Sequence, residues 1–163
     1  MQGKILIVDA IATNRIVLKV KLVTAFYEVV QATTLAEAVE MACTQSPDLI
    51  ITALSLPDGT AAALRQRLRA EPAAKYIPVM AVGAQASAPD RLATLRAGVR
   101  DILTRPLDET LLLGRVRSLI RAHTATADWQ MRDDTNHALG LAEPERPFAD
   151  QSHCMLVSAD RTL

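Results

Sequence analysis

The sequence predicts an α/β protein in which one parallel sheet is covered by helices on both faces. Short aliphatic runs alternate with longer stretches of helical period, the alternation repeats five times, and the connections are short. Such strict alternation requires right-handed crossovers that place helices on both sides of the sheet. Half of the 163 residues are apolar, which is enough for a real core.

The first two strands flank a segment long enough for a helix. Lys4–Val8 is an apolar run without alternation, as expected for a strand covered on both faces. The helical segment ends near Phe26, and Glu28–Val30 forms the second strand. Because parallel strands need a crossover connection, these three segments form one strand–helix–strand unit.

The second helix and third strand carry clearer boundary signals. Thr34 followed by Glu37 has the form of a capping box, so a helix should begin there and run to about Thr44. Asp48–Thr52 is the third strand, and Pro57–Gly59 predicts a turn.

The remaining segments continue the same alternation. We expect a helix over 61–70, a strand over 77–82, a helix from Pro89 to Gly98, a strand over 101–103 and a last helix from about Glu109 to Ala122 or beyond. Pro89 suits the first turn of a helix, Gly98 suits a C-cap, and Asp108 can cap the last helix. Five strands and five helices in about 120 residues match a flavodoxin-like, doubly wound sheet of order 2-1-3-4-5.

In that strand order, function lies outside the carboxyl ends of strands one and three. The positions of interest are therefore Asp9, Ala10 and Ala53 with their neighbours.

The composition changes after the last predicted core helix, which suggests three parts. Residues 1–123 form the domain, and 124–151 form a helical extension with Trp129 followed by a proline-rich linker at 143–147. Residues 152–163 contain Cys154–Ala159, which resembles Ile5–Ala10 and would be the first strand of a second, truncated domain of the same kind.

Charge and composition argue against several classes of function. Lys plus Arg and Asp plus Glu number 18 each, so we expect no general attraction to nucleic acid, and no apolar run approaches the length of a membrane span. Cys43 and Cys154 suit a reducing cytoplasm better than a disulfide framework. The three histidines lack the ligand spacing of a zinc site, so no metal site is predicted.

Four motifs together resemble the receiver domain of two-component response regulators. They are ILIVDAIATNR, PDLIITALSLPDG, IPVMAVGA and AGVRDILTRPLD. The resemblance covers residues 4–122 and implies a pocket where an acidic pair holds Mg²⁺, an aspartate accepts a phosphoryl group, and a hydroxyl and a lysine contact its oxygens.

Matched residue by residue, the pocket has lost this chemistry. The acidic pair is Asp9-Ala10, the acceptor position is Ala53, the hydroxyl position is Gly83 and the lysine position is Arg105. Only Asp9 keeps the family's residue. The resemblance therefore implies a pseudoreceiver that uses no cofactor, is not an enzyme and binds Mg²⁺ weakly or not at all.

Several other side chains have competing interpretations. Asp58 is the carboxylate nearest to Ala53, but turn chemistry explains it better than a role as substitute acceptor. Asp9 can pair with Arg105, cap the following helix, or do both. The stripe of Arg65, Arg67 and Arg69 indicates a solvated helix face rather than a phosphate site.

A receiver without an acceptor acts by binding, and the family commonly uses the surface of helix four, strand five and helix five. The residues available for packing there are Leu92, Leu95, Leu111, Leu112 and Val116, although some must belong to the core. The partners expected are a second copy, another receiver-like domain or a histidine kinase, with no nucleic acid and no membrane.

The segment after the first strand, and Leu-Leu-x-x-Arg-Val-Arg-Ser-Leu in the last helix, are similar to the first receiver of receiver–receiver–GGDEF diguanylate cyclases. This resemblance implies a regulatory dimerisation module of an enzyme that makes cyclic di-GMP. The alternatives are a stand-alone adaptor that binds a histidine kinase or receiver, and the regulatory half of a DNA-binding response regulator.

Overall fold

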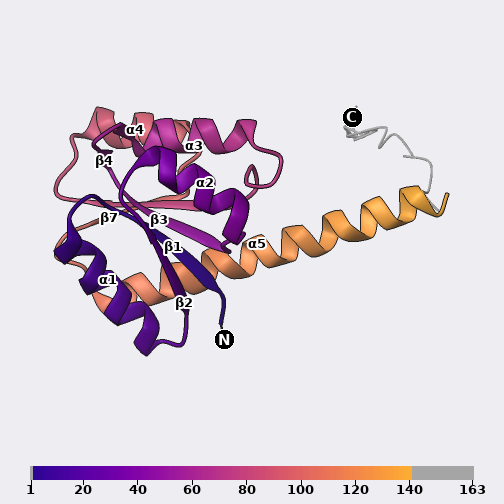
Figure 1. The fold of residues 1–163 in the computed structure, drawn as a ribbon, viewed down its shortest axis with the longest axis horizontal. Helices are drawn as coiled ribbons and strands as arrows, with labels where there is room; N and C mark the ends of the chain where they lie inside the picture. Colours follow the sequence, from indigo (N-terminus) through magenta and orange to yellow (C-terminus); the bar gives the residue numbers. More distant parts are fainter. Residues whose placement is uncertain (1, 141–163) are drawn as a thin grey trace, which may run out of the picture. The chain divides into compact units, whose positions relative to one another are not determined.

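The computed structural model describes residues 2–140, in which strands and helices alternate as predicted (Figure 1). In chain order the elements are β1 (Lys4–Val8), α1 (Ala12–Thr24), β2 (Glu28–Ala32), α2 (Leu35–Gln45), β3 (Leu49–Ala53), β4 (Ser55–Leu56), β5 (Gly59–Thr60), α3 (Ala61–Ala70), β6 (Val79–Gly83), α4 (Ala88–Arg96), β7 (Asp101–Thr104) and α5 (Glu109–Ala138).

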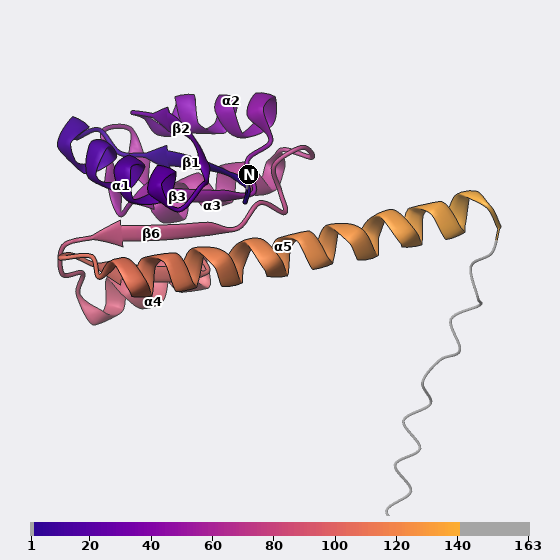
Figure 2. The ribbon, with the colours of Figure 1, turned by 90° about the horizontal axis from the view of Figure 1, so that it is seen from below.

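The main sheet has five parallel strands in the order β2-β1-β3-β6-β7. Figure 2 shows part of this order, from β2 through β1 and β3 to β6. Because β4 and β5 form a separate two-stranded hairpin, the five main strands follow the predicted 2-1-3-4-5 order, and the flavodoxin-like fold class is confirmed.

Alternate residues of each strand enter opposite layers of the core. In β1, Ile5 and Ile7 pack with Leu18 and Leu22 of α1 and with the buried residues of α5. The intervening Leu6 and Val8 pack with α2 and α3 on the other face. Figure 1 shows these two helical layers with the sheet between them. Covering both faces explains why the strands are uninterrupted apolar runs.

The residues predicted to cap helices do so in the structure, but one of them, Glu37, bonds to a different residue than a capping box requires. The Thr34 hydroxyl accepts a hydrogen bond from the Glu37 N–H at 3.2 Å, as a capping box requires. The Glu37 carboxylate, however, accepts from the N–H and the hydroxyl of Thr33, at 2.7 and 2.8 Å. Asp108 caps α5 by accepting from the Leu111 N–H at 2.8 Å.

The fourth helix is attached differently from the others. None of the residues of α4 is buried, although Ser87 caps its first turn and Pro89 lies near its start. Gly98 follows the helix with φ +101°, a conformation that favours glycine and ends the helix as predicted. Capping by Ser87 therefore stabilises the start of α4, and no fully buried side chain attaches the helix to the core.

The last helix extends past the predicted core. Leu112, Val116 and Ile120 are buried, and α5 continues to Ala138, in agreement with a helix that runs beyond Ala122. The chain divides into a compact unit of 1–128 and a second unit of 129–163. The predicted linker at 143–147 and the predicted strand at Cys154–Ala159 lie outside the described residues.

Candidate functional site

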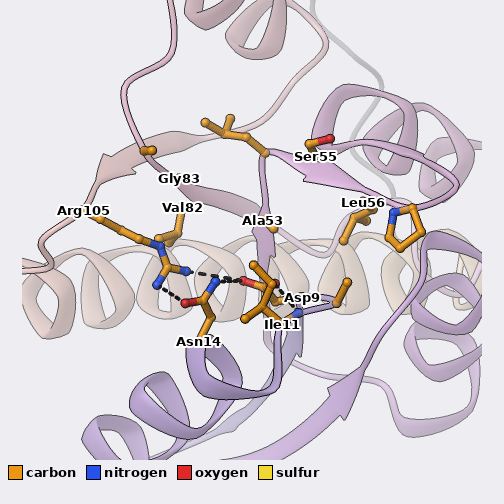
Figure 3. Close-up of a pocket in the computed structure, with 13 residues that line it drawn as sticks. Asp9, Ile11, Asn14, Ala53, Ser55, Leu56, Val82, Gly83 and Arg105 are labelled. Atoms are coloured by element: carbon orange, nitrogen blue, oxygen red, sulfur yellow. Dashed lines mark hydrogen bonds and ion pairs between the residues drawn. The ribbon is translucent and has the colours of Figure 1, made fainter.

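The carboxyl ends of β1, β3 and β6 surround a hollow of about 640 Å³ (Figure 3). It lies at the switch point of the sheet, where β1 has β2 on one side and β3 on the other. Its lining is mostly apolar and comprises Asp9, Ala10, Ile11, Asn14, Ala53, Leu54, Ser55, Leu56, Pro57, Val82, Gly83, Ala84 and Arg105. All five positions predicted from the sequence therefore lie at one pocket.

Asp9 is the buried acid of this pocket, with only 4% of its surface exposed. One carboxylate oxygen accepts from the Ile11 N–H at 2.9 Å, which fixes the turn between β1 and α1. The other oxygen accepts from Nδ2 of Asn14 at 3.0 Å. Asp9 therefore supports the start of α1, as one of the two interpretations predicted, although it acts just before the N-cap residue Ile11.

Arg105 completes a three-residue network at the pocket wall. Its Nη2 lies 3.4 Å from a carboxylate oxygen of Asp9, which confirms the predicted ion pair. Its Nη1 donates to Oδ1 of Asn14 at 2.9 Å. Figure 3 shows these contacts converging below Val82. Asn14 was not predicted as a site residue. The sign of it in the sequence is a polar amide in the first turn of α1, five residues after Asp9.

The ion pair does not fill the pocket. Asp9 and Arg105 meet at one wall, while methyl groups stand at the former acidic and acceptor positions, Ala10 and Ala53. The hollow therefore remains open beside Ala53 although the ion pair has formed.

The donor set does not fit the Mg²⁺ site that the family resemblance implies. Magnesium prefers several oxygen ligands in octahedral geometry, and among the described residues that line the pocket Asp9 supplies the only carboxylate. Both of its oxygens already accept hydrogen bonds. Among the described residues, no group of three or more His, Cys, Asp or Glu side chains could hold a metal ion.

Leu54 stands where the former hydroxyl side chain would be. A β-carbon built on Gly83 would lie 2.4 Å from Cδ1 of Leu54, which no real packing allows. The Leu54 N–H also donates to the carbonyl of Val82 at 3.2 Å, which holds the two strand ends together. No sequence pattern singles out Leu54, because its steric partner Gly83 is distant along the chain.

Asp58, considered as a substitute acceptor, has a different role. Its carboxylate accepts from the N–H groups of Leu35 and Ala36, at 2.7 and 3.1 Å, and so caps the first turn of α2. These hydrogen bonds, the one from Leu35 first, hold the pKa of Asp58 below its ordinary value. Asp58 does not line the pocket, and the turn interpretation missed this long-range cap.

The arginine stripe of α3 is only partly a solvated face. Arg67 and Arg69 are exposed, but Arg65 is half-buried and donates from Nη2 to the carbonyl of Lys75 at 2.9 Å. Burial, together with the charges of Arg69 and Arg100, lowers the pKa of Arg65. The prediction of a solvated face was therefore wrong for Arg65.

The residues proposed for an interface divide into two groups. Leu92, Leu95 and Leu111 are exposed by 44% or more and lie on α4 and α5. Leu112 and Val116 are fully buried in the core layer that α1 and α5 form with the sheet. Their assignment to an interface was wrong, because the side of α5 that carries them faces the strands.

A second exposed apolar surface lies on α1 and was not predicted. We define the α1 apolar face as Ile16, Val17, Val20 and Val23, which are each exposed by 43% or more. The buried residues of α1, Leu18 and Leu22, lie on the opposite side. Contiguous exposed apolar side chains of this kind mark interaction surfaces.

The strand order and the pocket at the switch point define a flavodoxin-like α/β protein whose candidate site lies at the carboxyl edge of its sheet. Residues 5–117, more than half of the chain, match the family described as "Response regulator receiver domain". The chain belongs to the response regulator receiver domain family.

Two curated relatives and one solved structure illustrate the similarity. Response regulator PleD of Caulobacter vibrioides is 32% identical over 141 residues, 86% of this chain and 31% of PleD. The KDP operon transcriptional regulatory protein KdpE of Escherichia coli is 38% identical over 98 residues, 60% of this chain and 42% of KdpE. This chain thus spans less than half the length of either relative.

The solved structure is the receiver domain of sensor histidine kinase PA1611 from Pseudomonas aeruginosa PAO1, with a magnesium ion coordinated in its active site cleft. It is 27% identical with a TM-score of 0.67, over 72% of this chain and 97% of that domain. In the part of the chain that the structure describes, no helix is long and apolar enough to cross a membrane.

Proposed function

We propose that this chain is a receiver-like signalling module that accepts no phosphoryl group and acts by protein–protein contact, without catalysis of its own. The observation that carries the proposal is Ala53 at the end of β3, where the family's acceptor carboxylate would stand. A methyl group cannot act as a nucleophile toward a phosphodonor. Cytoplasmic location and independence of cofactors belong to the same proposal.

The rest of the pocket supports this view. Arg105 is engaged with Asp9 and Asn14, so its charge is already partly neutralised within the chain. Gly83 has no hydroxyl, and Leu54 occupies the space for one. Four of the five expected groups are therefore missing or altered, and Mg²⁺ binding should be weak.

Self-association through the face formed by α4, β7 and α5 is the contact we favour. Leu92, Leu95 and Leu111 supply exposed apolar area. Nearby, Nε of Arg115 lies 3.2 Å from a carboxylate oxygen of Asp101, beside a hollow of about 290 Å³. An apolar centre rimmed by charges is typical of protein interfaces.

We further propose that the whole protein is a diguanylate cyclase response regulator with this module in its N-terminal regulatory part. The motif resemblance to receiver–receiver–GGDEF enzymes supports the proposal. So does the match to PleD: an aligned stretch of 141 residues reaches at least residue 141, past the end of α5 at Ala138. The similarity therefore includes the helical extension as well as the receiver.

The α1 apolar face favours a second candidate, an adaptor that binds a histidine kinase or another receiver. Its four aliphatic side chains contribute nothing to the core, and α1 carries no acidic residue to disfavour an anionic partner. The DNA-binding alternative stays a prediction, since no described residue favours it over the other two.

The phosphotransfer part of the proposal is tested by mass spectrometry. The chain is incubated with acetyl phosphate and Mg²⁺, beside a receiver domain that keeps the acidic pair and the acceptor aspartate. We expect an adduct of about 80 Da on the control and none on this chain, because no carboxylate stands at position 53. A stable adduct at any residue would contradict the proposal.

Sedimentation velocity tests the contact surface. We expect dimers at micromolar concentration, and monomers after Leu92→Asp or Leu111→Asp. Val20→Asp on the α1 apolar face is the matched control, since it replaces another exposed aliphatic residue elsewhere on the domain. A dimer that is lost with Val20→Asp and kept with Leu111→Asp would transfer the interface to α1.

A further inference from the structure

The open pocket above Ala53 has the size and position of a small-molecule site. Its volume of about 640 Å³ lies within the range of ligand pockets, roughly 300–1,000 Å³. It stands at the carboxyl edge of the sheet between β1 and β3, where folds of this class bind their ligands. The candidate site therefore contains a hollow and not a packed core.

The walls of this pocket are selective for a ligand with an apolar body. Ala53 and Ala84 present only methyl groups, while Ile11, Leu54 and Leu56 supply larger aliphatic surfaces. Contact with these walls removes apolar ligand surface from water, which is favourable at about 25 cal/mol per Å². A strongly hydrated ion such as free phosphate gains nothing from such walls.

Arg105 provides one cationic anchor at the edge of the pocket. A guanidinium has five N–H groups, and two of them donate to Asn14 and Asp9. Within residues 2–140, no acceptor is recorded for the other three, and 28% of the side chain is exposed. Arg105 can therefore donate hydrogen bonds to a planar carboxylate while it keeps its contacts with Asn14 and Asp9.

The charge of Asp9 limits the anion that can enter. Its side chain is 6% exposed, and its two oxygens accept from Ile11, Asn14 and Arg105. Asp9 is thus screened from the hollow, so a monoanion next to Arg105 meets a net attraction. Because Arg105 and Asp9 together carry no net charge, the second charge of a dianion would lose its hydration at the apolar walls without a second cation to offset that cost.

We propose that this pocket binds a small organic monocarboxylate, with its carboxylate on Arg105 and its short hydrocarbon chain over Ala53 and Leu54. The inference rests on the proposed function, because the pocket is available only if Ala53 carries no phosphoryl group. It makes the module a receiver controlled by a bound metabolite-sized acid instead of a phosphoryl group.

The test is a titration of the full ¹⁵N-labelled chain by nuclear magnetic resonance at constant ionic strength. Sodium butyrate, its neutral isostere butyramide and inorganic phosphate are the three probes. Butyrate should shift the amide signals of residues 53–56 and 83–84 saturably, with a dissociation constant of about 1 mM for so small a ligand. Butyramide should bind about tenfold more weakly, because it lacks the charge-assisted hydrogen bond.

Two variants separate the anchor from the walls. Arg105→Gln should reduce butyrate binding about tenfold, to the level of butyramide, while Arg105→Lys retains part of the preference. Ala53→Leu fills the hollow and should weaken butyrate and butyramide together, with the Asp9–Arg105 ion pair intact. Arg96→Gln on the exposed side of α4 is the matched control and should change nothing.

Each other outcome overturns the inference. Pocket signals that do not move at butyrate concentrations far above 1 mM, equal binding of acid and amide, or full binding by Arg105→Gln would each do so. Binding of phosphate in preference to butyrate would assign the site to a different class of ligand. None of these results alters the phosphodonor measurement, so failure here and failure of the proposed function are distinguishable.

Discussion

The Leu54 side chain and the missing side chain of Gly83 are steric complements. A β-carbon at position 83 would lie 2.4 Å from Cδ1 and 3.0 Å from Cγ of Leu54. Gly83 ends β6, and Leu54 directly follows the end of the neighbouring strand β3, since Ala53 pairs with Val82. Gly83 and Leu54 therefore form one packing arrangement, in which the leucine occupies the space that a side chain at position 83 would need.

This arrangement predicts the result of restoring the hydroxyl. Gly83→Ser should destabilise the chain by about 1–3 kcal/mol, because the new side chain overpacks against Leu54. In a chain that also carries Leu54→Ala, Gly83→Ser should lower the free energy of unfolding by a clearly smaller amount. Urea unfolding of the four proteins of this double-mutant cycle measures the coupling. Additive effects would show that the two residues do not compete for space.

Adjacent leucines on α5 give a second prediction. Leu112→Ala should destabilise the fold by about 2–5 kcal/mol, because it opens a cavity in the core layer formed with Val116. Leu111→Ala should change stability by less than about 0.5 kcal/mol, since its side chain is 49% exposed. Chemical unfolding checks both values, and equal losses would mean that the assigned faces of α5 are wrong.

The cap on α2 predicts a pH dependence. The pKa of Asp58 is lowered from 3.8, so the stability that it contributes is present above that pH and is lost as the pH falls through the folded-state pKa below it. Asp58→Asn should therefore lower the melting temperature near neutral pH, and the difference from the parent chain should shrink below pH 3.8. The exposed Asp128→Asn is the control, and a pH-independent difference would exclude the charged cap.

The α1 apolar face gives a fourth prediction. Val20→Lys should leave the free energy of unfolding within about 0.5 kcal/mol of the parent, because Val20 is 59% exposed. Leu22→Ala, two residues along the same helix, should cost about 2–5 kcal/mol because Leu22 is fully buried. Unfolding of the chain by Val20→Lys would contradict this prediction, because it would mean that the exposed side of α1 packs against another part of the protein.

The fold and the location of the site were predictable because their signals are local. Apolar runs such as Lys4–Val8 are typical of strands covered on both faces, and Thr34 marks the start of its helix without knowledge of the rest of the chain. The strand alternation then places the ends of β1 and β3 side by side. The Asp9–Arg105 ion pair followed from that topology and the charges of the two residues.

The features that sequence reasoning missed depend on distances between remote segments. Which leucines of α5 face the sheet is set by the rotation of the helix, and three consecutive leucines at 111–113 carry no periodic signal that fixes it. The hairpin β4–β5 has two residues in each strand, too few for any period. The Asp58 cap joins residues 22 and 23 positions apart, and Leu54 meets Gly83 only in the folded chain.

The lack of buried residues in α4 has a consequence for the lifetime of its hydrogen bonds. Opening α4 exposes no core side chain, so the free energy of opening should be far below that of global unfolding. Its amide hydrogens should exchange with solvent orders of magnitude faster than those of β1 and β3, whose residues are almost all buried. Leu92 and Leu95 thus stand on a segment that can rearrange on its own, and any partner that orders it should register first as slower exchange there.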